Sequence, residues 1–350
     1  MKYIRIIFFP FSLLYHQVTL LRNWLYDIRF FKSFDISIPT ISVGNLTVGG
    51  TGKTPVIEYL IRLLKDHHKI ITLSRGYKRK TNGFLIAGED DNAKTIGDEP
   101  FQYYNKFKNE IGVVVCEDRL YAIPQILSSL PETRLILLDD AFQHRKIIPS
   151  CNILLNDYSR PFYNDFLLPA GNLRESRKNA RRADVVIVTK CPEDISNKEI
   201  ENIHKSISKY TRKSVPIFFT STKYDSQVPV LNKKYQFTEK VILVTAIAEP
   251  EPLVNYIRRN FYLIKHFNFN DHHYFSSREL KRIISFYKTQ NDLDISILFT
   301  EKDIMRIIGT ELEDILMEYP VFFQPITYKF AQGESEFEEF IQKVLDKTED

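Results

Sequence analysis

A glycine-rich run that ends in lysine and threonine constrains this chain more than any other stretch. The run reads VGNLTVGGTGKTP and spans residues 43–55. An apolar segment from Pro39 to Val43 precedes it and predicts a buried strand, and a helical pattern from Pro55 to Lys65 follows it. A strand, a glycine-rich loop and a helix in this order form a phosphate-binding loop at the edge of an α/β sheet.

The residue types of this loop suit a phosphate group. Its glycines let the backbone curl so that successive N–H groups face an anion, and the helix N-terminus adds partial positive charge. Lys53 can reach the outer phosphates, and the hydroxyl of Thr54 can bind magnesium. The strict GxxxxGK[ST] pattern would have glycine where this chain has Thr47. The predicted nucleotide contacts are Gly49, Gly50, Thr51, Gly52, Lys53 and Thr54.

A pair of aspartates supplies the carboxylate that such a loop needs to hold a metal ion. The run RLILLDDAFQH is apolar up to Asp139 and Asp140, which places both at the carboxyl end of a predicted strand. Ligands of open α/β sheets bind at that edge. Either aspartate can serve as the metal ligand; the alternative is that both cap the next helix. His144, four residues after Asp140, receives no assigned role.

Short apolar runs alternate with helical patterns through the first two-thirds of the chain and predict buried parallel strands. We infer an α/β fold, a doubly wound, mostly parallel sheet of the P-loop NTPase type. The six predicted strands are Pro39 to Val43, Lys69 to Ser74, Gly112 to Cys116, Arg134 to Asp140, Cys151 to Asp157 and Asp184 to Lys190.

A second series of strands and helices indicates a smaller α/β domain, as a length of 350 residues favours two domains. A polar stretch, 221–240, precedes it. Its predicted strands are Val241 to Thr245, Ile264 to Phe269, Ile295 to Thr300 and Val321 to Tyr328. The predicted divisions are a membrane-associated helical segment (1–34), the P-loop core (35–220), the smaller domain (221–318), and a C-terminal strand and helix that pack back on the core (319–350).

The N-terminal segment combines apolar and cationic residues. Its most apolar run, Ile6 to Tyr15, is too short to cross a membrane and is interrupted by Pro10. Apolar residues then recur at helical spacing from Leu21 to Phe31, and cations outnumber the single acidic residue, Asp27. Such a helix can lie in the headgroup layer of an anionic membrane. A helix pair docked on the protein's own core is the alternative, and the two are compatible.

Other classes that use a phosphate-binding loop fit less well. A GTPase needs an [NT]KxD element, but in TKCP (residues 189–192) Pro192 replaces the aspartate. Partitioning ATPases carry a signature lysine where this chain has Val48. Aromatic residues do not alternate with the basic ones, so no nucleic acid partner is expected. Cys116, Cys151 and Cys191 lie alone in apolar runs and are expected to be buried, reduced thiols.

Seven segments together resemble the tetraacyldisaccharide 4'-kinases, which phosphorylate the lipid A precursor of Gram-negative bacteria. They follow the family's order from residue 42 to 303, and the family's loop also commonly lacks the first glycine. The segments are SVGNLTVGGTGKTP, LSRGYKR, GDEP, LLDDAFQHR, LLPAGNLRE, DHH and TEKD.

The resemblance implies transfer of the ATP γ-phosphoryl group to a sugar hydroxyl, with Mg²⁺. Asp98 of GDEP is then the base that accepts the hydroxyl proton, and Glu99 is a second metal ligand or an orienting group. His272 of DHH pairs with Asp98, whereas His273 is the less favoured partner. These two residues fall in different predicted domains, so the pair is expected to form across a cleft that closes on the substrate. Lys53 completes the predicted catalytic set.

The implied acceptor is an acylated glucosamine disaccharide 1-phosphate, which is both anionic and apolar. Arg75, Arg119 and Arg174 are predicted to contact its phosphate, since arginine grips phosphate with paired donors. The implied location is the cytoplasmic side of the bacterial inner membrane, as a peripheral or monotopic protein. The alternative function is a membrane-associated P-loop ATPase that acts as a switch or scaffold.

Overall fold

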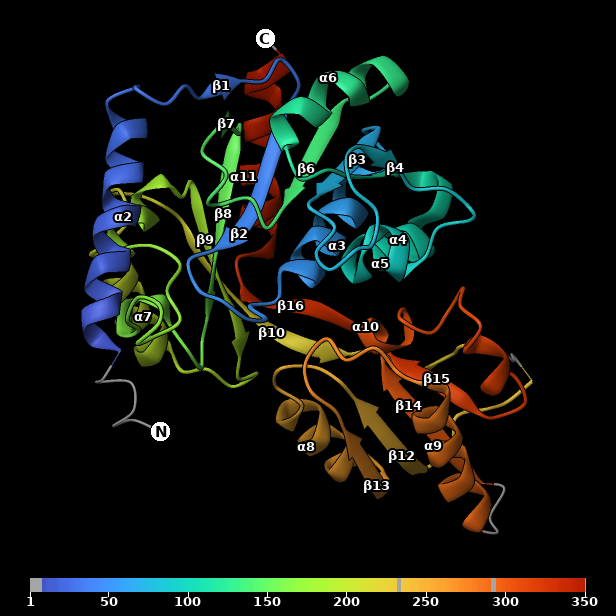
Figure 1. Cartoon of the computed structure of the whole chain (residues 1–350). Coiled ribbons are helices and arrows are strands. Elements are labelled where there is room, and N and C mark those ends of the chain that lie inside the picture. The colour runs from blue at the N-terminus through green and yellow to red at the C-terminus, as the bar shows by residue number, and fades with distance from the viewer. Residues whose placement is uncertain (1–7, 232–233, 291–293, 350) are drawn as a thin grey trace. The chain divides into compact units, whose positions relative to one another are not determined.

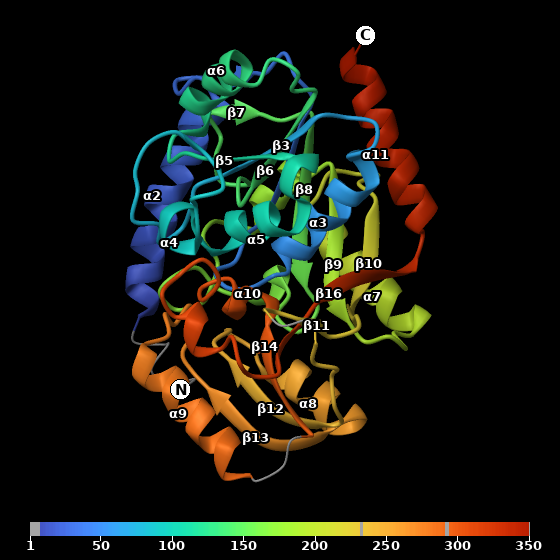
Figure 2. The ribbon, with the colours of Figure 1, turned by 90° about the vertical axis from the view of Figure 1, so that its right-hand side faces the viewer.

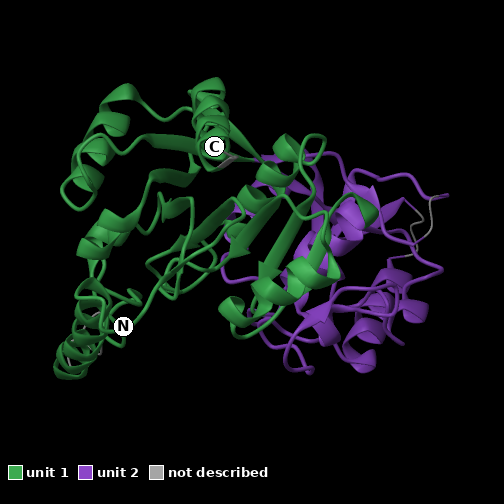
Figure 3. Cartoon of the chain, turned by 90° about the horizontal axis from the view of Figure 1, so that it is seen from above, with its two compact units in different colours: residues 1–75, 109–222, 328–350 green, residues 76–108, 223–327 purple. Residues whose placement is uncertain are grey.

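The computed structural model describes residues 8–231, 234–290 and 294–349. These residues fall into two compact units, each assembled from several stretches of chain (Figure 3). Unit 1 comprises residues 1–75, 109–222 and 328–350, and unit 2 comprises residues 76–108 and 223–327. The chain therefore visits unit 2 twice.

The main sheet of unit 1 is built from strands whose side chains are mostly buried, as expected for parallel strands covered on both faces. Its order is β16-β10-β9-β8-β2-β6-β3-β5. Every pairing from β10 to β5 is parallel. The bounds are β2 (Thr40–Asn45), β3 (Ile70–Ser74), β5 (Gly112–Val115), β6 (Leu135–Asp139), β8 (Cys151–Asp157), β9 (Val185–Cys191), β10 (Ile217–Tyr224) and β16 (Ile326–Gln332).

Strand order in this sheet places the phosphate loop at a switch point. From β2 the chain first adds β3 and β5 on one side, then returns to β6 beside β2, and later adds β8, β9 and β10 on the other side (Figure 1). In open α/β sheets the crevice at such a reversal, outside the carboxyl ends of the strands, binds ligands. The loop after β2 lies at this edge.

Helices cover the sheet of unit 1. The C-terminal helix α11 packs beside α3 through the Tyr59 ring, which contacts Phe330 and Phe337, while the Tyr59 hydroxyl donates to Glu338 (Figure 2). The helices are α2 (Phe9–Asp27), α3 (Lys53–Leu64), α6 (Arg119–Ser129), α7 (Asn197–Ser208) and α11 (Glu334–Glu349). Shorter elements are the parallel pair β1 (Phe34–Asp35) and β7 (Ile147–Ile148), and the 3-10 turns η1 (Lys108–Glu110), η2 (Phe162–Asn164) and η3 (Arg177–Arg182).

Unit 2 has its own sheet, in the order β11-β15-β14-β12-β13, parallel except for the β11 pairing. The strands of this sheet are β11 (Val228–Pro229), β12 (Lys240–Thr245), β13 (Tyr262–Asn268), β14 (Ile295–Thr300) and β15 (Val321–Gln324). The short strand β4 (Leu85–Ile86) also belongs to unit 2 but lies outside this sheet. The helices of unit 2 are α4 (Ala93–Ile96), α5 (Asp98–Phe107), α8 (Glu251–Asn260), α9 (Ser277–Thr289), α10 (Glu301–Ile304) and η4 (Glu313–Ile315).

The predicted α/β class with a mostly parallel sheet is confirmed, and all three cysteines are buried free thiols. The strand predicted from Val321 to Tyr328 is wrong in one respect. It divides into β15 and β16, which belong to different sheets, because Pro325 lacks the N–H that a continuous ladder needs. The predicted polar stretch also contains the end of β10 and all of β11. The predicted domain divisions remain a prediction.

Candidate active site

The phosphate loop joins β2 to α3 in unit 1. Gly52, at the N-cap of α3, has φ +81°, and Gly49 has φ +101°, which only glycine adopts without strain. A Cβ atom at Gly52 would also collide with the hydroxyl of Tyr328. Because the first N–H groups of a helix have no partner within it, the loop and the start of α3 present donors to an anion.

The acidic pair lies at the same sheet edge. Asp139 ends β6 and pairs in register with Val43 of β2, just before the loop. Lys53 Nζ is 3.6 Å from Asp140 Oδ1, and Arg174 NH1 lies 3.0 Å from both Asp140 oxygens. Burial would raise the pKa of Asp140, but the charges of Lys53 and Arg174 outweigh it and lower the pKa. Asp140 is therefore an ionised carboxylate shared by two cations.

The predicted substrate arginines have different surroundings. Arg119 is buried and its NH2 group donates to the main-chain carbonyls of Asp139 (2.7 Å) and Asp140 (3.3 Å), so it supports the end of β6. Arg174 contacts Asp140, and Arg75 is exposed at the end of the β3 segment. Their contact with a substrate phosphate stays a prediction.

The candidate oxygen ligands for Mg²⁺ all belong to unit 1, apart from Glu99. Thr54 on α3 and the carboxylates after β6 are hard oxygen donors of the kind Mg²⁺ prefers. Within the described ranges no group of three or more His, Cys, Asp or Glu side chains could hold a metal. That donor set fits Mg²⁺, which is usually held by one or two carboxylates and the phosphates of its nucleotide. Glu99 belongs to unit 2, where Lys302 Nζ donates to it at 3.1 Å.

His144 lies beyond the acidic pair. Burial, reinforced by the positive charge of Arg119, lowers its pKa to about 4. Its imidazole is therefore neutral at physiological pH and carries no positive charge.

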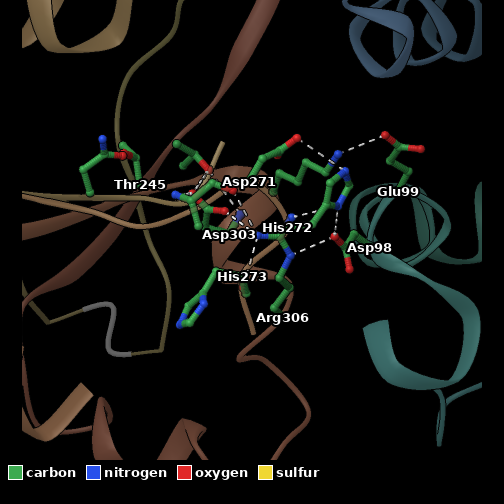
Figure 4. A network of polar contacts seen from close by, with 12 residues as sticks. Asp98, Glu99, Thr245, Asp271, His272, His273, Asp303 and Arg306 are labelled. Atoms are coloured by element: carbon green, nitrogen blue, oxygen red, sulfur yellow. Dashed lines mark hydrogen bonds and ion pairs between the residues drawn. The ribbon is translucent and has the colours of Figure 1, made fainter. Parts of the chain in front are cut away.

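Asp98, the predicted base, lies in unit 2. It is the first residue of α5, follows Gly97 (φ +97°), and its Oδ2 lies 3.2 Å from His272 Nδ1 and 2.7 Å from Arg306 Nε (Figure 4). Both Asp98 and His272 belong to unit 2, so the structure differs from the pair expected across a cleft between domains. The segment 76–108 carries Asp98 into the unit that contains the DHH loop.

Arg306 fixes Asp98 through a buried network (Figure 4). Its side chain is fully buried, and NH1 donates to Asp303 Oδ1 at 2.7 Å, three residues earlier in the chain. Asp303 is fully buried as well, and its Oδ2 accepts from the Ala246 N–H (2.7 Å) and the Thr300 hydroxyl (2.6 Å). The guanidinium therefore bridges two carboxylates and cannot change direction without breaking this network.

The second oxygen of Asp98, Oδ1, has different surroundings from Oδ2. Among the described residues, Oδ1 is buried and accepts no hydrogen bond. Burial would raise the pKa of Asp98, but the hydrogen bond from His272 and the charge of Arg306 outweigh it and hold the pKa below its ordinary value. Burial and the negative charge of Asp98 raise the pKa of the nearby Tyr274 phenol, which stays a neutral hydroxyl. The result is an ionised, desolvated carboxylate with one oxygen available.

The two histidines of the DHH segment make different contacts. His272 has φ +58°, its N–H donates to the Ala246 carbonyl (3.1 Å), and the Tyr77 ring meets its imidazole edge-on. His273 instead contacts Glu279 at 3.1 Å and stacks on Phe269. The structure therefore brings His272, not His273, to Asp98.

Sequence reasoning did not assign Arg306 or Asp303 to the site. Asp303 is the last residue of the quoted TEKD segment and lies on α10. An arginine three residues later, just beyond the end of this short helix, is the signal that could have identified the pair. That spacing reveals the Asp303–Arg306 contact but not the third partner, Asp98, which lies more than 200 residues away.

Comparisons with known proteins agree over nearly the whole chain. The family described as Tetraacyldisaccharide-1-P 4'-kinase (LpxK) matches residues 4–346. Proteins named tetraacyldisaccharide 4'-kinase are 43% identical in Flavobacterium psychrophilum (97% of each chain) and 37% identical in Cytophaga hutchinsonii (99% of this chain, 98% of the relative). The solved "apo" form of LpxK from Aquifex aeolicus in complex with ATP superposes with a TM-score of 0.74 at 29% identity and covers 98% of this chain and 99% of its own. The chain therefore belongs to the tetraacyldisaccharide 4'-kinase family and is a kinase with a P-loop NTPase-like fold.

Proposed function

We propose that this kinase transfers the γ-phosphoryl group of ATP to the 4'-hydroxyl of tetraacyldisaccharide 1-phosphate, the lipid A precursor, and so forms lipid IVA. The names of its relatives support the acceptor, and the ATP complex of the Aquifex aeolicus protein supports the donor. The observation that carries the proposal is Asp98, a buried carboxylate with Oδ2 fixed by Arg306 and Oδ1 available.

A sugar hydroxyl is a weak nucleophile, and its proton must leave as the bond to phosphorus forms. Asp98 Oδ1 accepts that proton. His272 Nδ1–H donates to Oδ2, because at 3.2 Å it is closer to Asp98 than to the Arg306 NH2 group at 3.4 Å, which is itself a donor. This hydrogen bond and Arg306 keep the carboxylate oriented before the reaction. His272 is thus proposed to tune the base rather than to replace it.

Unit 1 is proposed to bind the nucleotide. The N–H groups of residues 49–54 hold the phosphates and Lys53 reaches the outer ones. Thr54 with Asp139 or Asp140 would hold Mg²⁺, which neutralises the charge that develops on the transferred group. Glu99 remains a proposed second oxygen ligand or orienting group.

A labelling experiment tests the reaction and separates it from the alternative. Purified protein, Mg²⁺ and ATP labelled in the γ-phosphate are mixed with tetraacyldisaccharide 1-phosphate in micelles, and the lipid product is mapped by mass. Label on the distal sugar at the 4' position is the expected result. Release of free phosphate with no label in the lipid would instead support a membrane-associated ATPase that acts as a switch or scaffold.

Helix α2 supports a location at a membrane surface, which we propose is the cytoplasmic face of the inner membrane. None of the described helices is long and apolar enough to span a bilayer. The buried residues of α2 are the polar Ser12 and Asn23, which bond to the Leu167 carbonyl (3.0 Å) and to Glu175 (3.2 Å) of unit 1. Its exposed face carries large apolar side chains: Phe11, Leu14, Val18, Leu21 and Trp24.

This polarity is the reverse of that of an ordinary surface helix, which buries its apolar face. An apolar face that is left exposed on a helix held by polar contacts marks an interaction surface. We propose a peripheral or monotopic attachment in which this face enters the headgroup layer, where an acylated substrate also resides.

Charges on this face should release the protein from membranes. The double variant Leu14→Glu and Leu21→Glu should bind anionic vesicles at least about tenfold more weakly. Each substitution removes an apolar contact with the lipid and adds a negative charge that anionic headgroups repel. Both side chains are more than half exposed, so the melting temperature should not change. Vesicle co-sedimentation measures binding. The control variant, Tyr121→Glu with Ile148→Glu, adds the same charge elsewhere on unit 1; equal release by both pairs would refute the assignment to α2.

A further inference from the structure

Three successive main-chain carbonyls of the phosphate loop are held by side chains. Lys190 Nζ donates to the Gly50 carbonyl at 2.6 Å, the Thr189 hydroxyl to the Thr51 carbonyl at 2.9 Å, and the Tyr328 hydroxyl to the Gly52 carbonyl at 2.8 Å. Thr189 and Lys190 lie close to the carboxyl end of β9, and Tyr328 lies on β16. No sequence motif of the loop contains these donors, so the tertiary fold supplies them.

Peptide geometry gives these contacts a direction. In a planar trans peptide the carbonyl of one residue and the N–H of the next point in opposite directions. Fixing the carbonyls of residues 50, 51 and 52 therefore fixes the N–H groups of Thr51, Gly52 and Lys53 away from the three donors. These N–H groups are the ones that a phosphate-binding loop presents to its anion.

The donors themselves are held firmly. Lys190 has φ +58°, an uncommon conformation for a residue with a side chain, and its Nζ also contacts the buried Asp157 at 2.7 Å. Asp157 in turn accepts from the Ser159 N–H at 2.9 Å. Thr189 is fully buried. Strain of this kind persists only where the surroundings determine the conformation, which is consistent with a fixed support rather than a chance contact.

Tyr328 occupies a distinctive place in the chain. It is the first residue of unit 1 after the long segment of unit 2 that ends at Thr327. Its hydroxyl approaches Gly52 so closely that no other residue type fits there. The first residue of the chain after its return to unit 1 therefore contacts the phosphate loop.

We propose that Thr189, Lys190 and Tyr328 are positioning residues that hold the phosphate loop in its anion-binding conformation before the nucleotide arrives. Without them the loop peptides can rotate, and binding must then order them at the expense of affinity. The inference rests on the proposed use of ATP. It goes beyond the proposed function because it assigns the orientation of the N–H groups that bind the β-phosphate to residues outside the loop.

The test compares a nucleotide that has a β-phosphate with one that lacks it. Calorimetric titration gives the affinities of MgADP and AMP for the full-length protein. Tyr328→Phe and Thr189→Val should each weaken MgADP about fivefold, the effect of one lost hydrogen bond, and leave AMP unchanged. Thr189→Ser keeps the hydroxyl and should keep the wild-type affinity. Lys190 is left intact because its removal would leave Asp157 buried without its cation.

Two control variants match the chemistry at other sites of unit 1. Tyr59→Phe removes a tyrosine hydroxyl that bonds to Glu338, and Thr220→Val removes a buried hydroxyl that bonds to the Val188 carbonyl. Both should bind MgADP as the wild type does. Wild-type affinity in Tyr328→Phe and Thr189→Val, or equal weakening of MgADP and AMP, would overturn the proposal. A wild-type protein that binds no MgADP would instead contradict nucleotide binding by this loop.

Discussion

Asp98→Asn should lower kcat by about 10²–10⁴-fold and leave the affinity for ATP nearly unchanged. Asparagine has the same shape and its carbonyl oxygen can still accept from Arg306 Nε, but it cannot take a proton from the sugar hydroxyl. Asp98 belongs to unit 2, whereas the phosphate loop belongs to unit 1. Steady-state kinetics with the lipid acceptor and calorimetric titration with ATP measure the two quantities separately.

A carboxylate of the same unit provides the control for this variant. Asp91 accepts from the Gly88 N–H at 2.9 Å in a local turn, and Asp91→Asn should keep the wild-type kcat. Loss of ATP binding in Asp98→Asn by the same factor as the loss of turnover would show that Asp98 supports the structure rather than the chemistry. Lys53→Ala is expected to weaken ATP binding as well as turnover, since Lys53 is proposed to contact the outer phosphates.

The strands were largely predictable because burial imposes a simple pattern. A strand covered on both faces must be apolar at almost every position, and runs such as 135–138 and 185–188 have this pattern. The apolar pattern does not show which strands pair with one another or which sheet each strand joins. Pro325 marks a break in the apolar run after Val321, but the sequence does not show that β15 and β16 join different sheets. It also does not show that segment 76–108 joins residues 223–327 in one unit.

The candidate site was predictable where a motif carries its chemistry locally. Lys53 and Thr54 follow the glycines directly, and Asp139 and Asp140 end a strand, so sequence spacing alone places them at one sheet edge. Asp98 was different, since GDEP is otherwise an ordinary turn and only the family resemblance singled it out. The supporting groups escaped prediction because they act over long sequence separations: Arg306 on Asp98 and Tyr328 on Gly52.

Arg306→Gln should destabilise the protein by about 3–5 kcal/mol of unfolding free energy. The variant leaves Asp98 and Asp303 buried without the cation that bridges them. The neutral amide of glutamine supplies no positive charge to either carboxylate. Urea unfolding measures the change. Arg212→Gln provides the control: its ion pair with Asp184 is largely exposed, so its loss should cost less than about 1 kcal/mol.

The same variant should move the acid limb of kcat/KM to higher pH. In the wild type the folded-state pKa of Asp98 lies below its ordinary value, so the stability it contributes is present above that ordinary value and is lost as pH falls through the lowered one. Without Arg306, burial is opposed mainly by His272, and the pKa of Asp98 rises. Only the ionised carboxylate can accept the hydroxyl proton. As the pH is lowered, the variant should therefore lose activity at a higher pH than the wild type does.

A pH profile distinguishes this effect from simple loss of folded protein. Measurements of kcat/KM at pH values where circular dichroism shows Arg306→Gln to be folded should give an acid limb displaced upward from that of the wild type, while Arg212→Gln keeps the wild-type limb. A destabilised variant whose acid limb does not move would mean that Arg306 holds the fold but does not set the charge state of Asp98. Displacement of the limb would link the buried Asp303–Arg306 pair directly to the proposed base, because Arg306 contacts both the Asp98 and the Asp303 carboxylates.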